Sequence, residues 1–360
     1  MATAGANPSA GRMRTHVAAA QAARLGVVIV NYRGAVDTIE CLESLLRTPL
    51  PMKIVVVENG SGDASADVIR DWAAGTHMAK AESPMMAPLS SPPVAKPVPI
   101  ACLAAEAVGS EPSVDRLTLV TSPDNLGFAG GNNLGLRHLL ADPGLTHFWL
   151  LNNDTVVTRD APAALLARLQ SGPRIGMCGT IVRYYFAPDR VQALGGFSFS
   201  LLTGTGTALG GNTSATQGFD PQAVADATDF VLGASLAVSR DFLTRVGLMA
   251  EDYFLYFEEI DWATRNRRLG EDGFDIGFAH GATIFHKAGR SIGSTSSHSA
   301  RSPFSDYWMN RARLRYVWRH HRLLWPWHWL LGWGIILRRL LRRQPRHAGA
   351  ILRAMFGRPF

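Results

Sequence analysis

Short apolar runs alternate with helical apolar stripes over the first 170 residues of the chain. Residues 25–32 and 53–59 are continuous apolar runs rich in β-branched side chains, which is the pattern of buried parallel strands. A stripe of apolar positions at helical spacing follows each run, at residues 39–46 and 68–72. The order strand, helix, strand, helix predicts a parallel sheet with right-handed crossovers.

Polar residues near the start of each stripe are candidate helix caps. Asp37 and Glu40 have the spacing of a capping box, and Asp63 stands ahead of the second helix. These side chains are therefore expected to bond backbone groups in the first helical turns.

The alternation is interrupted at residues 75–113, where Pro, Ala, Ser and Met dominate. This composition predicts a long loop or a disordered insertion. The alternation then resumes with strands at 116–120 and 148–151, a helix between them, and a helix at 161–170.

From residue 175 onward the pattern is less regular. It includes glycine-rich stretches within 195–211, a strand pattern at 230–238, a helix at 240–246 and an extended segment that ends at His286. A second subregion of mixed structure is therefore expected.

The two ends of the chain differ from its middle. Residues 1–23 are rich in Ala, Gly and Ser and lack a long apolar core, so they predict a flexible tail rather than a secretory signal. Residues 323–337 are uncharged, rich in Trp and flanked by Arg. A helix of that length spans only about 22 Å, against about 30 Å of membrane hydrocarbon. The segment is expected either to lie at a membrane interface or to pack on the rest of the chain.

Composition is that of a globular protein, with 47% hydrophobic and 18% charged residues among 360. The formal net charge of +7 is concentrated in arginines of the last fifty residues, which predicts a basic surface patch. These arginines flank an apolar run rather than a reader motif, which argues against nucleic-acid binding. Cys41, Cys102 and Cys178 form no CxxC pair, which argues against a disulfide scaffold or a zinc-thiolate site and fits a reducing cytoplasm.

Asp154 is the leading candidate for metal chemistry. It ends the run Leu-Leu-Asn-Asn-Asp after an apolar strand, and open α/β sheets bind ligands beyond the carboxyl ends of their strands. On this pattern alone, Asp154 is either a ligand or the cap of the next helix. His286 ends another apolar run. One carboxylate and one imidazole, with a diphosphate and water, would complete an octahedral Mg²⁺ or Mn²⁺ site.

Three further polar groups stand at predicted element boundaries. Glu58 follows the second strand and could contact a base or a ribose. Residues 125–133 combine three glycines and three amides at a helix entrance, which suits either a diphosphate or simply a tight turn. Glu258, Glu259 and Asp261 follow an aromatic run, where they either complement a helix dipole or include a general base of raised pKa.

Taken in order, these pieces resemble the family 2 glycosyltransferases, inverting enzymes with a GT-A fold, and most closely their bacterial rhamnosyltransferase-like branch. The resemblance covers residues 24–320 and rests on five segments, at 28–32, 55–61, 125–133, 150–154 and 254–261. It implies an α/β fold in which a Rossmann-like nucleotide-sugar half with a mostly parallel sheet merges with a mixed acceptor-binding half. The boundaries are 24–170 with the insertion at 75–113, and 171–320. The sequence of residues 321–360 itself predicts a C-terminal helical, membrane-associating segment after them.

The resemblance also implies roles for matching residues. Asp154 matches the metal-binding end of the family's DXD-like motif, and His286 matches a further metal ligand. Glu259 matches the catalytic base, and Glu258 is a rival because relatives have Asp at the position of Glu259. Contacts to the nucleotide sugar are implied for Asn31, Glu58, Asn125, Gly127, Asn132 and Asn153.

The implied activity is metal-dependent, inverting transfer of a hexose from a dTDP- or UDP-sugar, with rhamnose suggested by the branch. The implied acceptor is a glycan or polyprenyl-linked glycan in bacterial cell-surface polysaccharide synthesis. We expect the protein to be cytoplasmic and peripheral at the inner face of the membrane, which it would contact through its C-terminal segment. Two alternatives are a nucleotide-sugar-binding protein with impaired catalysis and a membrane-surface scaffold.

Overall fold

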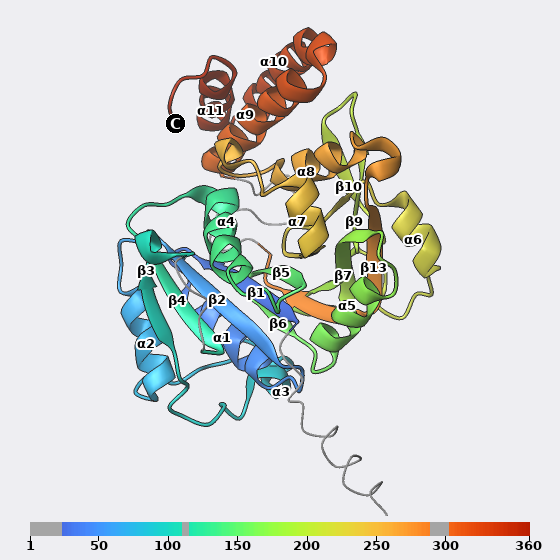
Figure 1. The fold of residues 1–360 in the computed structure, drawn as a ribbon. Coiled ribbons are helices and arrows are strands. Elements are labelled where there is room, and N and C mark those ends of the chain that lie inside the picture. Colours follow the sequence, from blue (N-terminus) through green and yellow to red (C-terminus); the bar gives the residue numbers. More distant parts are fainter. Residues whose placement is uncertain (1–23, 110–114, 289–301) are drawn as a thin grey trace, which may run out of the picture.

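The computed structural model describes residues 24–109, 115–288 and 302–360 (Figure 1). The flexible tail predicted at residues 1–23 lies outside the described residues. Within those residues the strands form one ten-stranded sheet and a separate three-stranded sheet. The large sheet has the order β3-β4-β2-β1-β5-β12-β7-β13-β6, with β8 paired to β7, so it runs through both predicted halves.

The first half is parallel from β3 to β5, as the alternating pattern predicted. Its elements in chain order are β1 (Leu25–Asn31), α1 (Ala35–Leu46), β2 (Met52–Asn59), α2 (Ser65–Ala74), α3 (Ala87–Ser90), β3 (Ala101–Ala104), the 3₁₀ helix η1 (Ala105–Ala107), β4 (Leu117–Ser122), α4 (Gly127–Leu140), β5 (His147–Asn152), β6 (Thr155–Val157) and α5 (Ala161–Gln170).

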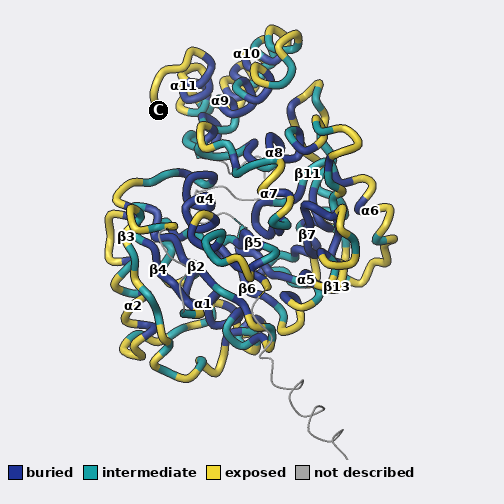
Figure 2. The backbone as a smooth tube through the Cα atoms, in the orientation of Figure 1, coloured by how far each residue is buried: buried dark blue, intermediate teal, exposed yellow. Residues whose placement is uncertain are grey.

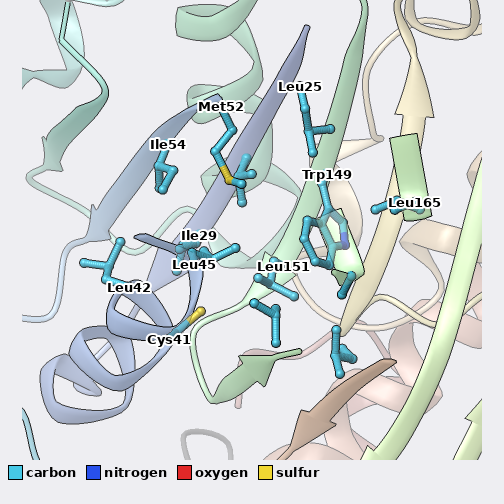
Figure 3. Close-up of a cluster of buried hydrophobic side chains, with 14 of the residues drawn as sticks. Leu25, Ile29, Cys41, Leu42, Leu45, Met52, Ile54, Trp149, Leu151 and Leu165 are labelled. Carbon is cyan, nitrogen blue, oxygen red and sulfur yellow. The ribbon is translucent and has the colours of Figure 1, made fainter. Parts of the chain in front are cut away.

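Both faces of the parallel strands are covered, which explains their continuous apolar sequences. Val27 and Ile29 of β1 pack with Leu42 of α1 in one buried cluster, part of which Figure 3 shows. Val28, between them, packs on the opposite face with Leu136 of α4. Each such side chain contributes about 1.5–3 kcal/mol when fully buried. The buried strands lie inside a shell of more exposed helices and loops (Figure 2).

The second half is mixed, also as predicted. β12 is antiparallel to β5 and β7, while β13 is parallel to β7 and antiparallel to β6. Its elements are β7 (Ile175–Tyr184), β8 (Ala187–Leu194), β9 (Gly196–Ser200), β10 (Thr205–Ala208), α6 (Pro221–Ala227), β11 (Phe230–Val231), β12 (Ser235–Ser239), α7 (Arg240–Val246), η2 (Glu251–Tyr253), α8 (Glu258–Arg267), η3 (Gly270–Asp272) and β13 (Asp275–His286).

The predicted capping box on α1 is wrong. The N-cap is Gly34, without a side-chain cap, and both Asp37 and Glu40 instead pair with Lys287. Asp63 does accept a hydrogen bond from the N–H of Ser65, at 2.9 Å, at the start of α2. A tertiary ion pair thus replaces the local cap at α1, whereas the local bond forms at α2.

Two other predicted boundaries need correction. The insertion is not a bare loop, because its described part forms α3 and the edge strand β3, which pairs with β4. The strand predicted at 230–238 is split into β11 and β12 by a turn that contains Gly233. Glycine inside a strand pattern is the sequence signal of such a break.

The last segment is helical, with α9 (Pro303–His320), η5 (Arg322–Leu324), α10 (Trp325–Leu341) and α11 (Pro345–Met355). Asp261 of α8 fixes α9 to the body of the protein: it accepts hydrogen bonds from His320 at 2.6 Å and Tyr253 at 3.0 Å, and pairs with Arg265 at 2.8 Å. Burial alone would raise the pKa of Asp261, but His320 and Arg265 outweigh it and lower that pKa to about 2. The carboxylate therefore stays charged and holds the two helices together.

Helices α10 and α11 stand beside α9 at the top of Figure 1. Asp306 of α9 binds Arg339 of α10 and His347 of α11, each at 2.8 Å. Trp327 and His328 of α10 bond to backbone carbonyls of the β9–β10 turn. α10 is therefore packed on the protein along one side.

Away from these contacts α10 carries a stripe of exposed apolar residues, Leu330, Trp333, Leu337 and Leu341, and Leu323 of η5 and part of Trp327 are exposed as well. No helix in the described part of the chain is long and apolar enough to cross a membrane. The packing alternative is thus confirmed for this segment, and the membrane-interface alternative stays a prediction.

Candidate active site

A cavity of about 510 Å³ lies beyond the carboxyl ends of β1, β2 and β5. The turn between β11 and β12, the segment before α8, the end of β13 and the start of α9 complete its walls. Eight residues proposed from the sequence line it: Asn125, Gly127, Asn132, Asn153, Asp154, Glu258, Glu259 and His286. Segments far apart in the chain thus bring their polar side chains to one place.

Asp154 and His286 form a close pair on the cavity wall. β6 pairs with β13 so that Thr155 lies opposite His286, and the N–H of Lys287 donates to the carbonyl of Asp154 at 2.9 Å. The Oδ1 atom of Asp154 lies 3.1 Å from Nε2 of His286. Two neighbouring ligands of an octahedral ion, each about 2.1 Å from it, would lie roughly 3 Å apart. The separation fits a shared divalent cation.

Gln192 of β8, which the sequence did not single out, orients His286. Its Oε1 atom lies 2.9 Å from Nδ1 of the imidazole. An amide oxygen only accepts, so Nδ1 carries a proton in this contact and Nε2 is the ring nitrogen that faces Asp154. This is the outer contact that usually fixes a metal-binding histidine. A glutamine in an amphipathic strand gives no sequence signal of that role.

The charge of the cavity wall also fits a cation. Among the described residues that line it, Asp154, Glu258 and Glu259 are acidic and none is Lys or Arg. These carboxylates would repel a diphosphate unless a bound cation balanced the negative charge. Residues 24–109, 115–288 and 302–360 contain no cluster of three or more His, Cys, Asp or Glu suited to a metal ion. At the Asp154–His286 pair the protein would supply two ligands and leave the remaining positions to a ligand and water.

Glu258 and Glu259 begin α8 on the same cavity. Both side-chain oxygens of Glu258 are buried without a hydrogen-bond partner in the described part of the chain. Burial, followed by the neighbouring charge of Glu259, raises the pKa of Glu258 well above its usual range. Burial likewise raises the pKa of Glu259 to about 7. A carboxylate serving only the helix dipole would have a lowered pKa, so these shifts favour the general-base interpretation.

Gly233 makes the space that the Glu259 carboxylate occupies. A Cβ atom at Gly233 would lie 2.0 Å from Oε1 of Glu259 and 3.2 Å from the ring of Phe128. Any larger residue would displace the carboxylate. The break between β11 and β12 therefore has a direct geometric effect on the proposed base.

The segment before α8 is strained. Phe254, Tyr256 and Phe257 have φ values of 66°, 70° and 70°, each in the left-handed region. Such residues cost on the order of 1–3 kcal/mol each and persist only when their surroundings fix them. The ring of Phe254 stacks on Trp308 of α9 at 4.4 Å, and its carbonyl accepts from the N–H of Phe128 at 2.8 Å. Contacts with α9 and α4 thus fix the backbone of the segment that leads into Glu258.

The start of α4 differs from the diphosphate cradle considered from the sequence. The N–H of Leu126 donates to Asn59, that of Gly127 to Asn125, and that of Phe128 to Phe254. These three N–H groups already have acceptors within the protein, so they are not free to bind an anion. The glycines serve close packing instead: a Cβ at Gly127 would lie 2.3 Å from the Phe254 carbonyl oxygen.

Asn31 and Glu58 are buried and do not line the cavity. They are opposite one another in the pairing of β1 with β2. Glu58 accepts from the side chain of Asn31 and, at 2.7 Å, from the N–H of Ser61. Asn31 accepts from Thr38, which in turn accepts from Asn153. This chain of bonds ties β2, β1, α1 and the Asp154 turn together.

Comparisons with known proteins bear on the fold. No family model matches the chain. Protein Mb1552 of Mycobacterium bovis and protein Rv1525 of Mycobacterium tuberculosis, both uncharacterized, are each 31% identical over 166 residues, 45% of this chain. The chain spans 55% of the length of these curated relatives.

Among solved structures, GalNAc-T7 with UDP, GalNAc and Mn²⁺ has a TM-score of 0.52 and 11% identity, covering 83% of this chain and 48% of that one. The chain has a GT-A-like fold. The mannosyltransferase PcManGT from Pyrobaculum calidifontis, in complex with GDP-Man and Mn²⁺, has a TM-score of 0.48 and 15% identity, covering 95% and 77% of the two chains. The sheet topology and the likeness to GalNAc-T7 confirm the mixed α/β architecture that the family resemblance implied.

The buried position of Glu58 predicts a structural effect of its substitution. In Glu58→Gln, an amide donor would face the donors of Asn31 and Ser61, and we expect a loss of about 1–3 kcal/mol in the free energy of unfolding. Urea denaturation followed by circular dichroism measures it. The exposed Glu106→Gln is the control and should stay within about 0.5 kcal/mol of wild type. Unchanged stability of Glu58→Gln would contradict this role.

Proposed function

We propose that the protein is a glycosyltransferase that uses a nucleotide-sugar donor. One observation carries the proposal: a single cavity beyond the strand ends holds both the Asp154–His286 pair and the Glu258–Glu259 pair. Cation ligands and a carboxylate base are the two groups that transfer from a sugar diphosphate requires. The GT-A-like fold and the nucleotide and Mn²⁺ bound to GalNAc-T7 support the same conclusion.

In this proposal Asp154 and His286 hold a divalent cation, Mg²⁺ or Mn²⁺. The bound ion would neutralise the charge that develops on the departing diphosphate. Gln192 accepts a hydrogen bond from Nδ1 of His286 and so orients Nε2 toward this contact. Asn125, Asn132 and Asn153 offer side-chain amides on the cavity wall for the donor.

Glu259 is the proposed catalytic base. Its carboxylate takes the proton of the acceptor hydroxyl as the oxygen bonds to the anomeric carbon, and the bond from that carbon to the diphosphate breaks in the same step. A single displacement of this kind inverts the anomeric configuration. Glu258 is buried and has no hydrogen-bond partner among the described residues, so we expect it to be protonated. In that neutral form it does not repel the carboxylate of Glu259.

The finer assignment follows the family resemblance: a family 2, inverting enzyme of the rhamnosyltransferase-like branch that uses a dTDP- or UDP-sugar. We propose a glycan or polyprenyl-linked acceptor in bacterial cell-surface polysaccharide synthesis. The apolar side chains of Phe254, Phe304 and Met309 on the cavity wall suit the less polar part of such an acceptor. Glu58 and Asn31 would act on the donor only through the residues they support.

Attachment to the cytoplasmic face of the membrane is the further part of the proposal. The exposed apolar stripe of α10 is accompanied by Arg338, Arg342 and Arg343 at its carboxyl end. Apolar and aromatic side chains beside arginines suit a surface of anionic lipids. Such attachment would bring the cavity to a lipid-linked acceptor.

The metal role predicts the effect of Asp154→Ala. Loss of charge stabilisation worth several kcal/mol should lower donor turnover by roughly 10²–10³-fold, at 1.36 kcal/mol per factor of ten. Release of sugar from a panel of radiolabelled nucleotide sugars measures this without knowledge of the acceptor. EDTA should reduce wild type to the same level, and Mn²⁺ or Mg²⁺ should restore it. A folded Asp154→Ala variant that is as active as wild type would refute the metal mechanism.

The base role predicts that Glu259→Gln binds the donor but loses about 10²–10⁴-fold in kcat for transfer. Gly233→Ala should lower kcat too, because the added methyl displaces the carboxylate. Since only the ionised base accepts a proton, wild-type kcat/KM should fall as pH drops below about 7. Gly349→Ala, where a Cβ meets no atom within 4 Å, is the control.

Two other outcomes would change the assignment. If Glu258→Gln alone abolishes turnover, the base is Glu258. If wild type binds donors without turning them over, the protein is a nucleotide-sugar-binding protein.

Membrane attachment predicts flotation with vesicles that contain phosphatidylglycerol. The triple variant Leu330→Ser/Leu337→Ser/Leu341→Ser should bind at least about tenfold more weakly, because the apolar area that would be buried in the membrane is lost. Met78→Ser, an exposed apolar residue in the insertion, is the control and should float like wild type. Wild type that stays at the bottom of the gradient would contradict the attachment.

A further inference from the structure

A buried group of charges lies directly behind the Asp154–His286 pair. The side chain of Lys287 is 1% exposed, and its Nζ atom lies 2.5 Å from Asp37 and 2.7 Å from Glu40. A third carboxylate, Glu82, is 3.7 Å away. Lys287 follows the proposed ligand His286 in the chain, and its own N–H bonds to the carbonyl of Asp154. One residue therefore contacts the backbone of the proposed metal pair and three acidic side chains.

The acidic partners come from two other parts of the fold. Asp37 and Glu40 belong to the start of α1, whose residue Thr38 accepts a hydrogen bond from Asn153 at 3.1 Å. Glu82 belongs to the insertion at residues 75–109. The ammonium of Lys287 thus connects α1 and the insertion to the end of β13.

Tyr185, which follows β7, makes a second connection. Its hydroxyl donates to Glu40 at 2.6 Å and accepts the backbone N–H of Ser83 at 3.1 Å. Its ring is buried and faces the Lys287 ammonium, with Nζ 4.9 Å from the ring centroid. Met86 of the insertion packs in the same buried cluster. This part of the insertion is therefore fixed to the protein core behind the site.

The cluster around Met86 reaches the two strands next to the pair. It contains Val156 of β6, two residues after Asp154, and Phe285 of β13, directly before His286. The far end of the insertion is attached elsewhere: Lys96 and the N–H of Val94 both bond to Glu43 of α1. The two ends of the insertion can therefore be tested separately.

We propose that Lys287 is a positioning residue for the metal pair, and that residues 82–86 of the insertion brace Asp154 and His286 through Lys287 and Tyr185. This inference rests on the proposed function, since it assumes that the pair binds a cation. The insertion would then serve cation binding from behind the site, without contact to the donor. Partners in this outer layer typically change metal affinity by 10- to 100-fold.

The test is binding of Mn²⁺ alone to the full chain, followed by the electron paramagnetic resonance signal of the free ion. Lys287→Met should weaken binding at least about tenfold, and Tyr185→Phe, which removes only the hydroxyl, should weaken it by a smaller factor. Lys96→Met is the matched control: it releases the other end of the same insertion and should bind Mn²⁺ like wild type. Melting curves of each variant verify folding.

Each result decides a different point. If Lys287→Met does not fold, Tyr185→Phe decides alone. Wild-type affinity in both folded variants overturns the brace, as does an equal loss in Lys96→Met, which would indicate a general effect of loosening the insertion. Failure of wild type to bind Mn²⁺ overturns the proposed metal role itself. Weaker binding in Lys287→Met and Tyr185→Phe, with Lys96→Met unchanged, supports the brace.

Discussion

The antiparallel pairing of β6 with β13 is the constraint on which the candidate site depends. It sets Thr155 opposite His286 and so brings Asp154, in the turn before β6, to the same edge of the sheet as His286, at the end of β13, although the two residues are 132 positions apart. Side chains alternate between the faces of a strand, so a shift of this register by one residue would turn His286 away from Asp154. The three residues of β6 thus fix the relative position of Asp154 and His286.

The charges of the site follow from the same arrangement. Carboxylates gather at the strand ends, and the cavity wall has no Lys or Arg among its described residues. The available cations lie one layer away: Lys287 pairs with Asp37 and Glu40, and Arg265 pairs with Asp261. Positive side chains hold the scaffold in place, while the negative charge inside the cavity is left for an incoming ion and its ligand to balance. This division of charge suits a protein that recruits a metal together with a diphosphate.

Much of the fold could be predicted because its signals are local. Strands covered on both faces have continuous apolar sequences, and the α5 boundaries at Ala161–Gln170 follow from an apolar stripe between polar turns. The α1 capping box failed because the partner of Asp37 lies 250 residues away, where no local pattern reveals it. The edge strand β3 was missed because four residues without clear alternation resemble a loop. Pairing with β4 decides its conformation.

The candidate site divides along the same line. Acidic residues at strand and helix ends could be recognised from their positions, and eight of the proposed residues do line one cavity. Asn31 and Glu58 also end strands, but they are hydrogen-bonded to one another and do not line the cavity. Gln192 and Lys287 act through tertiary contacts only. The sequence therefore identified the side chains that line the cavity, but it did not identify the residues that hold them in position.

The strained segment before α8 has a consequence for how this sequence can change. Phe254, Tyr256 and Phe257 occupy left-handed backbone positions that glycine would adopt at lower cost. The ring of Phe254 stacks on Trp308 of α9, and Phe254 and Tyr256 both line the cavity. A change to glycine at either of these two positions would relieve backbone strain but remove a ring from the cavity wall, so folding stability and cavity shape place opposite demands on this segment.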